Sequence, residues 1–207
     1  PESKIFATGI PISDRFSKSH NRQEILNKYN LSDNKKTILF FGGGEYGLGK
    51  TRTAQIFEDF VKTDGDFQII AIAGKNPKMK ASFEEIVQKN QKSSSVRILE
   101  FTNEVPELMS ISDLVVTKPG GLTTSESLAS HLPMCIINPI PGQEEENAEF
   151  LESKGIAVWL KKNDDSKKVI NELLSNPNKL QSMKENTLLL AKPNSTKDIC
   201  DILLQNF

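Results

Sequence analysis

KPGGLTTSESLASHLPMCIINPIPGQEEENAEFL, which spans Lys118–Leu151, is the part of this sequence that says most about its fold. Its middle segment, Met134–Asn138, is short and almost wholly apolar, as strands covered on both faces are. Helix-forming patterns lie on either side, over Thr123–Ser130 and Glu144–Lys154. Together with the apolar run that ends just before Lys118, these segments make a β-α-β-α unit, and such units build parallel sheets.

The rest of the chain repeats this alternation. Strands are expected at Thr37–Phe41, Phe67–Ala73, Val96–Phe101, Leu114–Thr117, Met134–Asn138 and Ile156–Leu160. Helices are expected at Asn21–Tyr29, Leu48–Val61, Lys78–Lys89, Val105–Ser110, Thr123–Ser130, Glu144–Lys154, Ser166–Ser175, Pro177–Leu190 and Ser195–Leu204. The pattern predicts an α/β fold with a doubly wound parallel sheet, in which ligands bind at the carboxyl ends of the strands. We expect one domain over residues 36–207, after a lead-in of residues 1–35.

The composition is that of a globular protein. The 207 residues are 37% hydrophobic and 26% charged, with a net charge of -1, which gives no reason to expect nucleic acid as a partner. No apolar run approaches the roughly 20 residues of a membrane span. Cys135 and Cys200 are the only cysteines, so a disulfide framework is not expected and a reducing compartment fits.

A second glycine turn, Gly42-Gly43-Gly44, follows the first expected strand. Gly44–Thr51 matches the phosphate-binding pattern G-x-x-x-x-G-K-[ST]. A P-loop NTPase also needs a carboxylate at the end of another apolar strand to organise magnesium; no expected strand ends in one, and Asp113 precedes its strand. A P-loop and a plain β-to-α turn stay as alternatives. The favoured interpretation is that the glycines let the backbone approach a diphosphate at a helix N-terminus.

The turn Lys118–Gly121 offers similar chemistry. Its glycines leave room for a phosphate, and the helix that follows presents N–H donors and the positive end of its dipole. The hydroxyls of Thr123, Thr124 and Ser125 could donate to phosphate oxygens, but capping of the helix is the favoured role. The Glu126 carboxylate could accept hydrogen bonds from a ribose diol, and spacing alone leaves this open against an ordinary surface glutamate.

Amide and carboxylate groups follow the next expected strand. Gln143 and Glu144 come after a stiff loop with two prolines, where the following helix starts. Such side chains commonly read sugar hydroxyls, and acidic groups also simply favour a helix N-terminus. For Glu145 and Glu146 the second interpretation is preferred.

Four motifs resemble one enzyme family: TGIPI at Thr8–Ile12, FFGGG at Phe40–Gly44, KPGGLTTSESLA at Lys118–Ala129 and NPIPGQEEENAEFL at Asn138–Leu151. They resemble the C-terminal half of monogalactosyldiacylglycerol synthases and of processive diacylglycerol β-glucosyltransferases. More distantly, the chain resembles the N-acetylglucosaminyltransferase of lipid II synthesis. These are inverting, metal-independent GT-B glycosyltransferases with two Rossmann-like domains. The resemblance implies that this chain is the C-terminal, Rossmann-like donor domain.

The same resemblance implies a role for each motif residue. The diphosphate would be surrounded by Gly43, Gly44, Gly120, Gly121, Leu122 and Thr123, with Lys118 offsetting its charge. The uracil would be held by the loop that contains Phe101, Thr102 and Val105, largely through backbone groups. Glu126 would bind the ribose, and Gln143 and Glu144 would read the donor sugar.

The resemblance also implies what lies outside this chain. The family's N-terminal domain binds the lipid acceptor and supplies the catalytic base, so no catalytic residue is expected here, and this chain alone is expected to be inactive. The full-length enzyme would be a hexosyltransferase that uses UDP-glucose or UDP-galactose, without a metal or cofactor, on diacylglycerol or a similar lipid. It would act in the cytoplasm, peripherally on the inner face of the membrane. Three alternatives stay open: a P-loop NTPase, a non-catalytic UDP-sugar-binding subunit with a separate acceptor subunit, and a sugar-nucleotide epimerase.

Overall fold

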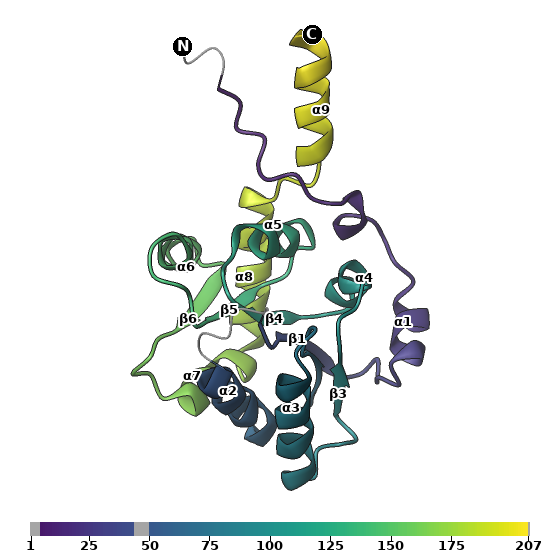
Figure 1. The fold of residues 1–207 in the computed structure, drawn as a ribbon, viewed down its shortest axis with the longest axis vertical. Helices are drawn as coiled ribbons and strands as arrows, with labels where there is room; N and C mark the ends of the chain where they lie inside the picture. The colour runs from purple at the N-terminus through teal and green to yellow at the C-terminus, as the bar shows by residue number, and fades with distance from the viewer. Residues whose placement is uncertain (1–4, 44–49, 207) are drawn as a thin grey trace.

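Parallel strands alternate with helices along the described chain, residues 5–43 and 50–206 of a computed structural model (Figure 1). The strands are β1 (Lys36–Phe41), β2 (Phe67–Ile72), β3 (Val96–Leu99), β4 (Leu114–Thr117), β5 (Met134–Ile137) and β6 (Ala157–Leu160). The helices are the 3-10 helix η2 (Asp14–Phe16) and the α-helices α1 (Arg22–Lys28), α2 (Lys50–Lys62), α3 (Pro77–Lys89), α4 (Val105–Ser110), α5 (Gly121–Ala129), α6 (Gln143–Ser153), α7 (Ser166–Leu174), α8 (Pro177–Leu190) and α9 (Ser195–Asn206).

The strands form a parallel sheet in the order β3-β2-β1-β4-β5-β6, so the predicted doubly wound fold is confirmed. Ile38 of β1 pairs with Ile69 of β2 on one side and with Leu114 of β4 on the other. The direction of winding therefore reverses between β1 and β4. In sheets of this kind, the crevice at such a reversal is where ligands bind.

Alternate side chains of each strand enter two separate cores, because strand side chains point to opposite faces in turn. Ile38 and Phe40 join the core covered by α2, α3, α7 and α8. Phe40 packs edge-on against Phe57 of α2, with ring centroids 5.1 Å apart. Leu39 joins the opposite core, which is covered by η2, α1, α4, α5 and α6. Helices on both faces explain why the strands are apolar throughout.

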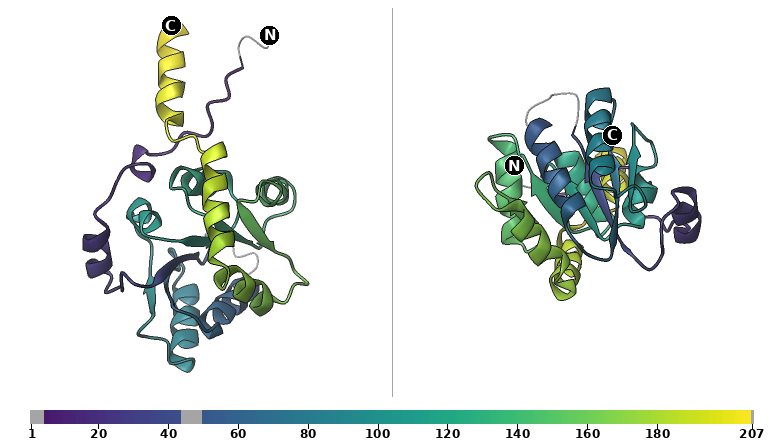
Figure 2. Two further views of the ribbon diagram at one scale, coloured as in Figure 1. Left: turned by 180° about the vertical axis from the view of Figure 1, so that it is seen from behind. Right: turned by 90° about the horizontal axis from the view of Figure 1, so that it is seen from below.

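The lead-in contributes to this second core. Ile12, Phe16 and Leu26 are buried in it. The lead-in is also tied to α9, because the hydroxyls of Ser195 and Thr196 donate to the carbonyl oxygens of Ile10 and Ile12 at 2.7 and 2.6 Å. Figures 1 and 2 show α9 and the N-terminal segment leaving the sheet at the same end.

Most element boundaries lie within two residues of the expected ones. The end of β3 is one of the larger differences, because it lies at Leu99, two residues before the expected end, and leaves Phe101 outside the sheet. The first two residues of the helix expected at Leu48–Val61 lie outside the described residues. Over residues 5–43 and 50–206, no helix has both the length and the apolar composition that crossing a membrane requires.

Candidate functional site

A cavity of about 380 Å³ opens at the carboxyl edge of the sheet, around the reversal between β1 and β4. It is lined by predicted site residues from four separate segments: Gly43, Phe101, Thr102, Val105, Lys118, Gly120, Thr123 and Glu144. Phe41, Ile72, Gly74 and Thr117, which the sequence did not single out, complete the lining. The fold thus brings the two glycine turns and the loop that contains Phe101, Thr102 and Val105 together.

The glycine turn after β1 leaves this cavity open. Gly43 has a φ of +96°, and a Cβ atom on it would have no heavy atom within 4 Å. Gly42 has a different role, because its Cβ would lie 3.1 Å from the Ile72 carbonyl oxygen and from Phe83. Gly42 therefore allows close packing, and Gly43 adopts a backbone that favours glycine beside open space. Gly44 lies outside the described residues.

The N-terminus of α5 forms another wall. Its N-cap is Gly120, in extended conformation, and the first backbone bond runs from Thr124 N to the Gly120 carbonyl oxygen at 2.9 Å. The N–H groups of residues 121–123 precede that bond, and Thr123 lines the cavity. These N–H groups and the helix dipole favour an anion at this point.

Two interpretations of this turn are wrong. The hydroxyls of Thr123, Thr124 and Ser125 do not cap α5, because the helix starts before them, at Gly121, and Gly120 makes no side-chain cap bond. Gly121 does not make room for a ligand either: its Cβ would lie 2.9 Å from the Ile10 Cδ1 atom, so the missing side chain accommodates the lead-in.

Besides Gly121, three predicted residues lie outside the cavity lining: Leu122, Gln143 and Glu126. Leu122 and Gln143 are exposed. Glu126 is partly buried, three residues after Thr123 and hence on the same side of α5. Burial raises the pKa of Glu126 above its ordinary value of 4.5. A carboxylate with little water around it gains more from hydroxyl donors than an exposed one.

The start of α6 closes the cavity on a further side. The Glu144 Oε2 atom accepts a hydrogen bond from the Ile140 N–H at 2.7 Å, and its Oε1 atom would lie 3.6 Å from a Cβ on Gly120. The Asn147 side chain donates to the Pro119 carbonyl oxygen at 2.9 Å. These contacts hold α6 against the turn before α5, so Glu144 has a fixed place beside the anion-favouring N–H groups.

A second cavity, also of about 380 Å³, lies along the ends of β5 and β6 and shares Lys118 with the first. Pro139, Ile140 and the half-buried Trp159 line it. The Arg52 guanidinium closes the end of β6 by donating to the carbonyl oxygens of residues 160–162. The two cavities therefore adjoin at Lys118.

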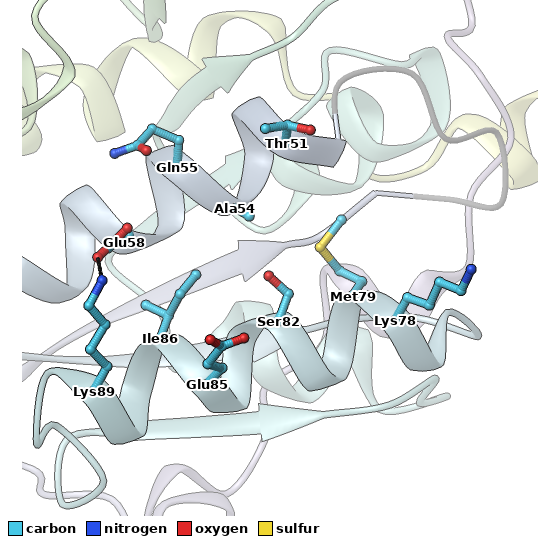
Figure 3. A pocket seen from close by; sticks show the side chains of 10 residues that line it. All are labelled: Thr51, Ala54, Gln55, Glu58, Lys78, Met79, Ser82, Glu85, Ile86 and Lys89. Carbon is cyan, nitrogen blue, oxygen red and sulfur yellow. Dashed lines mark ion pairs between the residues drawn. The ribbon is translucent and has the colours of Figure 1, made fainter.

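Another cavity, of about 460 Å³, lies elsewhere, in a groove between α2 and α3 (Figure 3). Thr51, the last residue of the P-loop pattern, lines it. An ion pair between Glu58 and Lys89, 3.6 Å apart, lies at its far end in Figure 3. Because this groove lies on a helical layer and not at the carboxyl edge of the strands, we do not assign the ligand site to it.

The P-loop alternative has mixed structural support. Its residues 44–49 lie outside the described part of the chain. Asp113 is at the amino edge of the sheet, as expected, where its carboxylate accepts from the Thr37 N–H at 2.7 Å. The expectation that no strand ends in a carboxylate is wrong, because Glu100 directly follows β3. However, the Glu100 carboxylate is already paired with Lys80 at 2.7 Å. In addition, β2 lies between β3 and β1, so Glu100 does not follow a strand next to the one that precedes the P-loop pattern.

The described residues contain no group of three or more His, Cys, Asp or Glu side chains that could hold a metal ion. A glycine turn after β1 and a helix N-terminus after β4, open to one cavity, place the chain in the class of Rossmann-like α/β proteins.

Within this class, the chain belongs to the glycosyl transferases group 1 family, which it matches over residues 21–189. A processive diacylglycerol β-glucosyltransferase of Staphylococcus epidermidis is 36% identical over 204 residues, which are 99% of this chain and 51% of that protein. The chain thus spans about half the length of the curated relatives it matches. The resemblance seen in the four motifs is confirmed.

Solved structures show the same fold. Anabaena HepE in complex with UDP-glucose aligns with a TM-score of 0.68 at 13% identity, covering 94% of this chain and 56% of that one. MurG of Acinetobacter baumannii aligns with a TM-score of 0.66 at 20% identity, covering 95% and 57%. These likenesses establish that the chain has the Rossmann-like fold seen in the matching parts of those two structures.

Proposed function

We propose that this chain is the donor-binding domain of an inverting glycosyltransferase that moves a hexose from a UDP-sugar to diacylglycerol or a similar lipid. The observation that carries the proposal is the cavity between β1 and β4, where the Gly43 turn, the N-terminus of α5 and the Phe101–Val105 loop meet. The family supports glycosyl transfer. The names of the relatives support the lipid acceptor, and the UDP-glucose complex of HepE supports the donor class.

The lining suggests how the donor lies. The uracil rests against Phe101, Thr102 and Val105, and the diphosphate crosses from Gly43 to the start of α5. The ribose hydroxyls reach Glu126 along the α5 surface that begins at Thr123. The hexose lies at the Gln143–Glu144 end, next to the cavity that shares Lys118.

In the proposed reaction, the acceptor hydroxyl attacks the anomeric carbon while the bond from that carbon to the diphosphate oxygen breaks. The electron pair of that bond leaves with UDP. The N–H groups of residues 121–123 and the Lys118 side chain stabilise this growing charge, as preorganised donors do. The acceptor proton passes to a base that we assign to the other domain of the full-length protein. In this scheme the chain's own groups stabilise the leaving diphosphate, so we propose a reaction without a metal or cofactor.

Calorimetry on this chain tests the assignment. UDP should bind in the presence of EDTA, and ATP with magnesium should not. Binding of ATP with magnesium, lost in Lys50→Ala, together with no binding of UDP, would refute the donor site and favour the P-loop. As a matched control, Lys35→Ala removes a lysine at the amino edge, which pairs with Asp66 at 3.6 Å, and should leave UDP binding unchanged.

We further propose that the full-length protein works in the cytoplasm, peripherally on the inner face of the membrane, because its proposed acceptor is a membrane lipid. Glucosyl transfer from UDP-glucose to diacylglycerol in vesicles, measured with the full-length protein, tests this and the choice between glucose and galactose. Transfer that requires a second, separately produced subunit would instead support the non-catalytic donor-binding alternative.

A further inference from the structure

The loop Glu100–Val105, called the base loop below, is fixed from two sides. On one side, Glu100 pairs with Lys80 of α3 at 2.7 Å. The Lys75 ammonium lies 5.0 Å from the centre of the Phe101 ring. On the other side, contacts come from α1 in the lead-in, which is far from the base loop in the sequence. These contacts all converge on Glu104.

Glu104 is the N-cap residue of α4, yet its side chain does not cap that helix. Its carboxylate instead accepts from the Lys28 ammonium through Oε1 and from the Tyr29 hydroxyl through Oε2. The hydrogen bonds from Lys28 and Tyr29 lower the pKa of Glu104. Burial, and then the bond to Glu104, raise the pKa of Tyr29 to about 12, so this hydroxyl keeps its proton at neutral pH.

Tyr29 is itself held in place. The Arg97 guanidinium of β3 donates to the carbonyl oxygens of Tyr29 and Asn30 at 2.9 and 2.7 Å. The Tyr29 ring packs against the core on the α1 and α4 face of the sheet. Thus a rigid strand fixes Tyr29, and Tyr29 fixes Glu104.

Glu104 connects these contacts to the residues that line the cavity. Its backbone N–H donates to the Thr102 Oγ1 atom at 3.1 Å, and Thr102 and Val105 on either side of it line the cavity. Recognition by backbone groups requires those groups to be held within about half an ångström of the productive position. A shift of Glu104 would move the two lining residues that flank it.

We propose that Lys28 and Tyr29 are positioning residues that set the nucleobase selectivity of the donor site by holding the base loop through Glu104. This inference rests on the proposed function of the cavity. Neither side chain lines that cavity, so neither is expected to touch the nucleotide.

The ratio of the affinities for UDP and CDP tests the inference, since the two ligands differ only along one edge of the base. Calorimetry should give a preference for UDP that falls roughly three- to tenfold in Tyr29→Phe and in Lys28→Met, the effect of one hydrogen bond. Lys28→Arg should retain the preference. The matched control is Arg22→Gln on α1, the same helix as Lys28; it removes a 2.8 Å ion pair to Asp33 and should leave the preference unchanged.

The possible outcomes separate this inference from the proposed function. If the unaltered chain binds no UDP, the donor site itself is refuted. If it binds UDP and the ratio stays the same in Tyr29→Phe and Lys28→Met, the positioning role is overturned while the donor site stands. An equal loss of UDP and CDP affinity, with a lowered melting temperature, would also overturn it, because that result indicates a merely structural role.

Discussion

Gly120→Ala should abolish most nucleotide binding without destabilising the protein. Gly120 has φ -65° and ψ 146°, an extended conformation that alanine adopts readily, and its Cβ would meet only the Glu144 Oε1 atom, at 3.6 Å. Alanine lowers the entropy of the unfolded chain, which stabilises by about 0.4–1 kcal/mol. It is a poorer N-cap than glycine by about 0.5 kcal/mol. These effects nearly cancel, so the melting temperature should change by less than about 2 °C.

The effect on binding should be far larger. The new methyl group would lie in the cavity, ahead of the N–H groups of residues 121–123, and would keep a phosphate oxygen away from them. Loss of one hydrogen bond to a charged group costs about 1.5–3 kcal/mol, which corresponds to roughly a ten- to hundredfold loss of UDP affinity.

Gly121→Ala is the matched control. Its Cβ would meet the Ile10 Cδ1 atom at 2.9 Å, outside the cavity, and that methyl group can move because it ends a partly exposed side chain. UDP affinity should stay within about twofold of the original value. Thermal melting by circular dichroism and UDP calorimetry on both variants check these expectations. Undiminished UDP binding in Gly120→Ala would refute the placement of the diphosphate at this turn.

Three further results are expected. Burial raises the pKa of Glu126, and in the proposed donor site its ionised form accepts hydrogen bonds from the ribose hydroxyls. UDP affinity should therefore fall as the pH is lowered through this raised pKa, and Glu126→Gln should remove that dependence and weaken binding at neutral pH; a calorimetric pH series decides this. Gly43→Ala should lower the free energy of unfolding by about 1–2 kcal/mol, because φ is +96° there, and urea denaturation measures this. A thiol reagent should label the exposed Cys200 in the native protein and leave Cys135 unlabelled until unfolding, because burial raises the pKa of Cys135 to about 12; mass spectrometry after timed labelling tests it.

The sequence predicts the elements whose ends carry local signals. α8 begins at Pro177, as expected, because Asn176 caps it with a side-chain bond to the Lys179 N–H at 3.0 Å and proline suits the first turn. β4 has its predicted bounds because its four residues, three of them apolar, are all buried and the charged residues Asp113 and Lys118 flank them. In both cases the residues themselves determine the boundary.

The features that the sequence analysis did not predict depend on residues that are distant in the sequence. β3 stops at Leu99 because its neighbour β2 stops at the paired residue, Ile72, and a strand beyond its partner has no ladder to join. The role of Gly121 depends on Ile10, which has no recognisable link to it in the sequence. Likewise, Ile72 and Thr117 line the cavity only because β2 and β4 flank β1, and the sequence does not specify that order.

The expected start of the domain at residue 36 leads to a last prediction. Ile12, Phe16, Ile25 and Leu26 are buried in the core on the α4–α6 face, and each buried side chain of this kind stabilises a fold by about 1.5–3 kcal/mol. Their sum, roughly 6–12 kcal/mol, is as large as the whole stability of a typical domain, about 5–15 kcal/mol.

A protein of residues 36–207 should therefore lack cooperative unfolding and bind a hydrophobic dye, whereas the 207-residue chain should melt in one sharp transition. The quadruple variant with alanine at these four positions removes the buried side chains but keeps residues 1–35. If the lost burial causes the instability, this variant should behave like the truncated protein. A sharp melt of residues 36–207 close to that of the longer chain would show that the lead-in merely rests on the domain. If the prediction holds, the lead-in is part of the folding unit, and its contact with Glu104 through α1 is built into the fold that forms the proposed donor cavity.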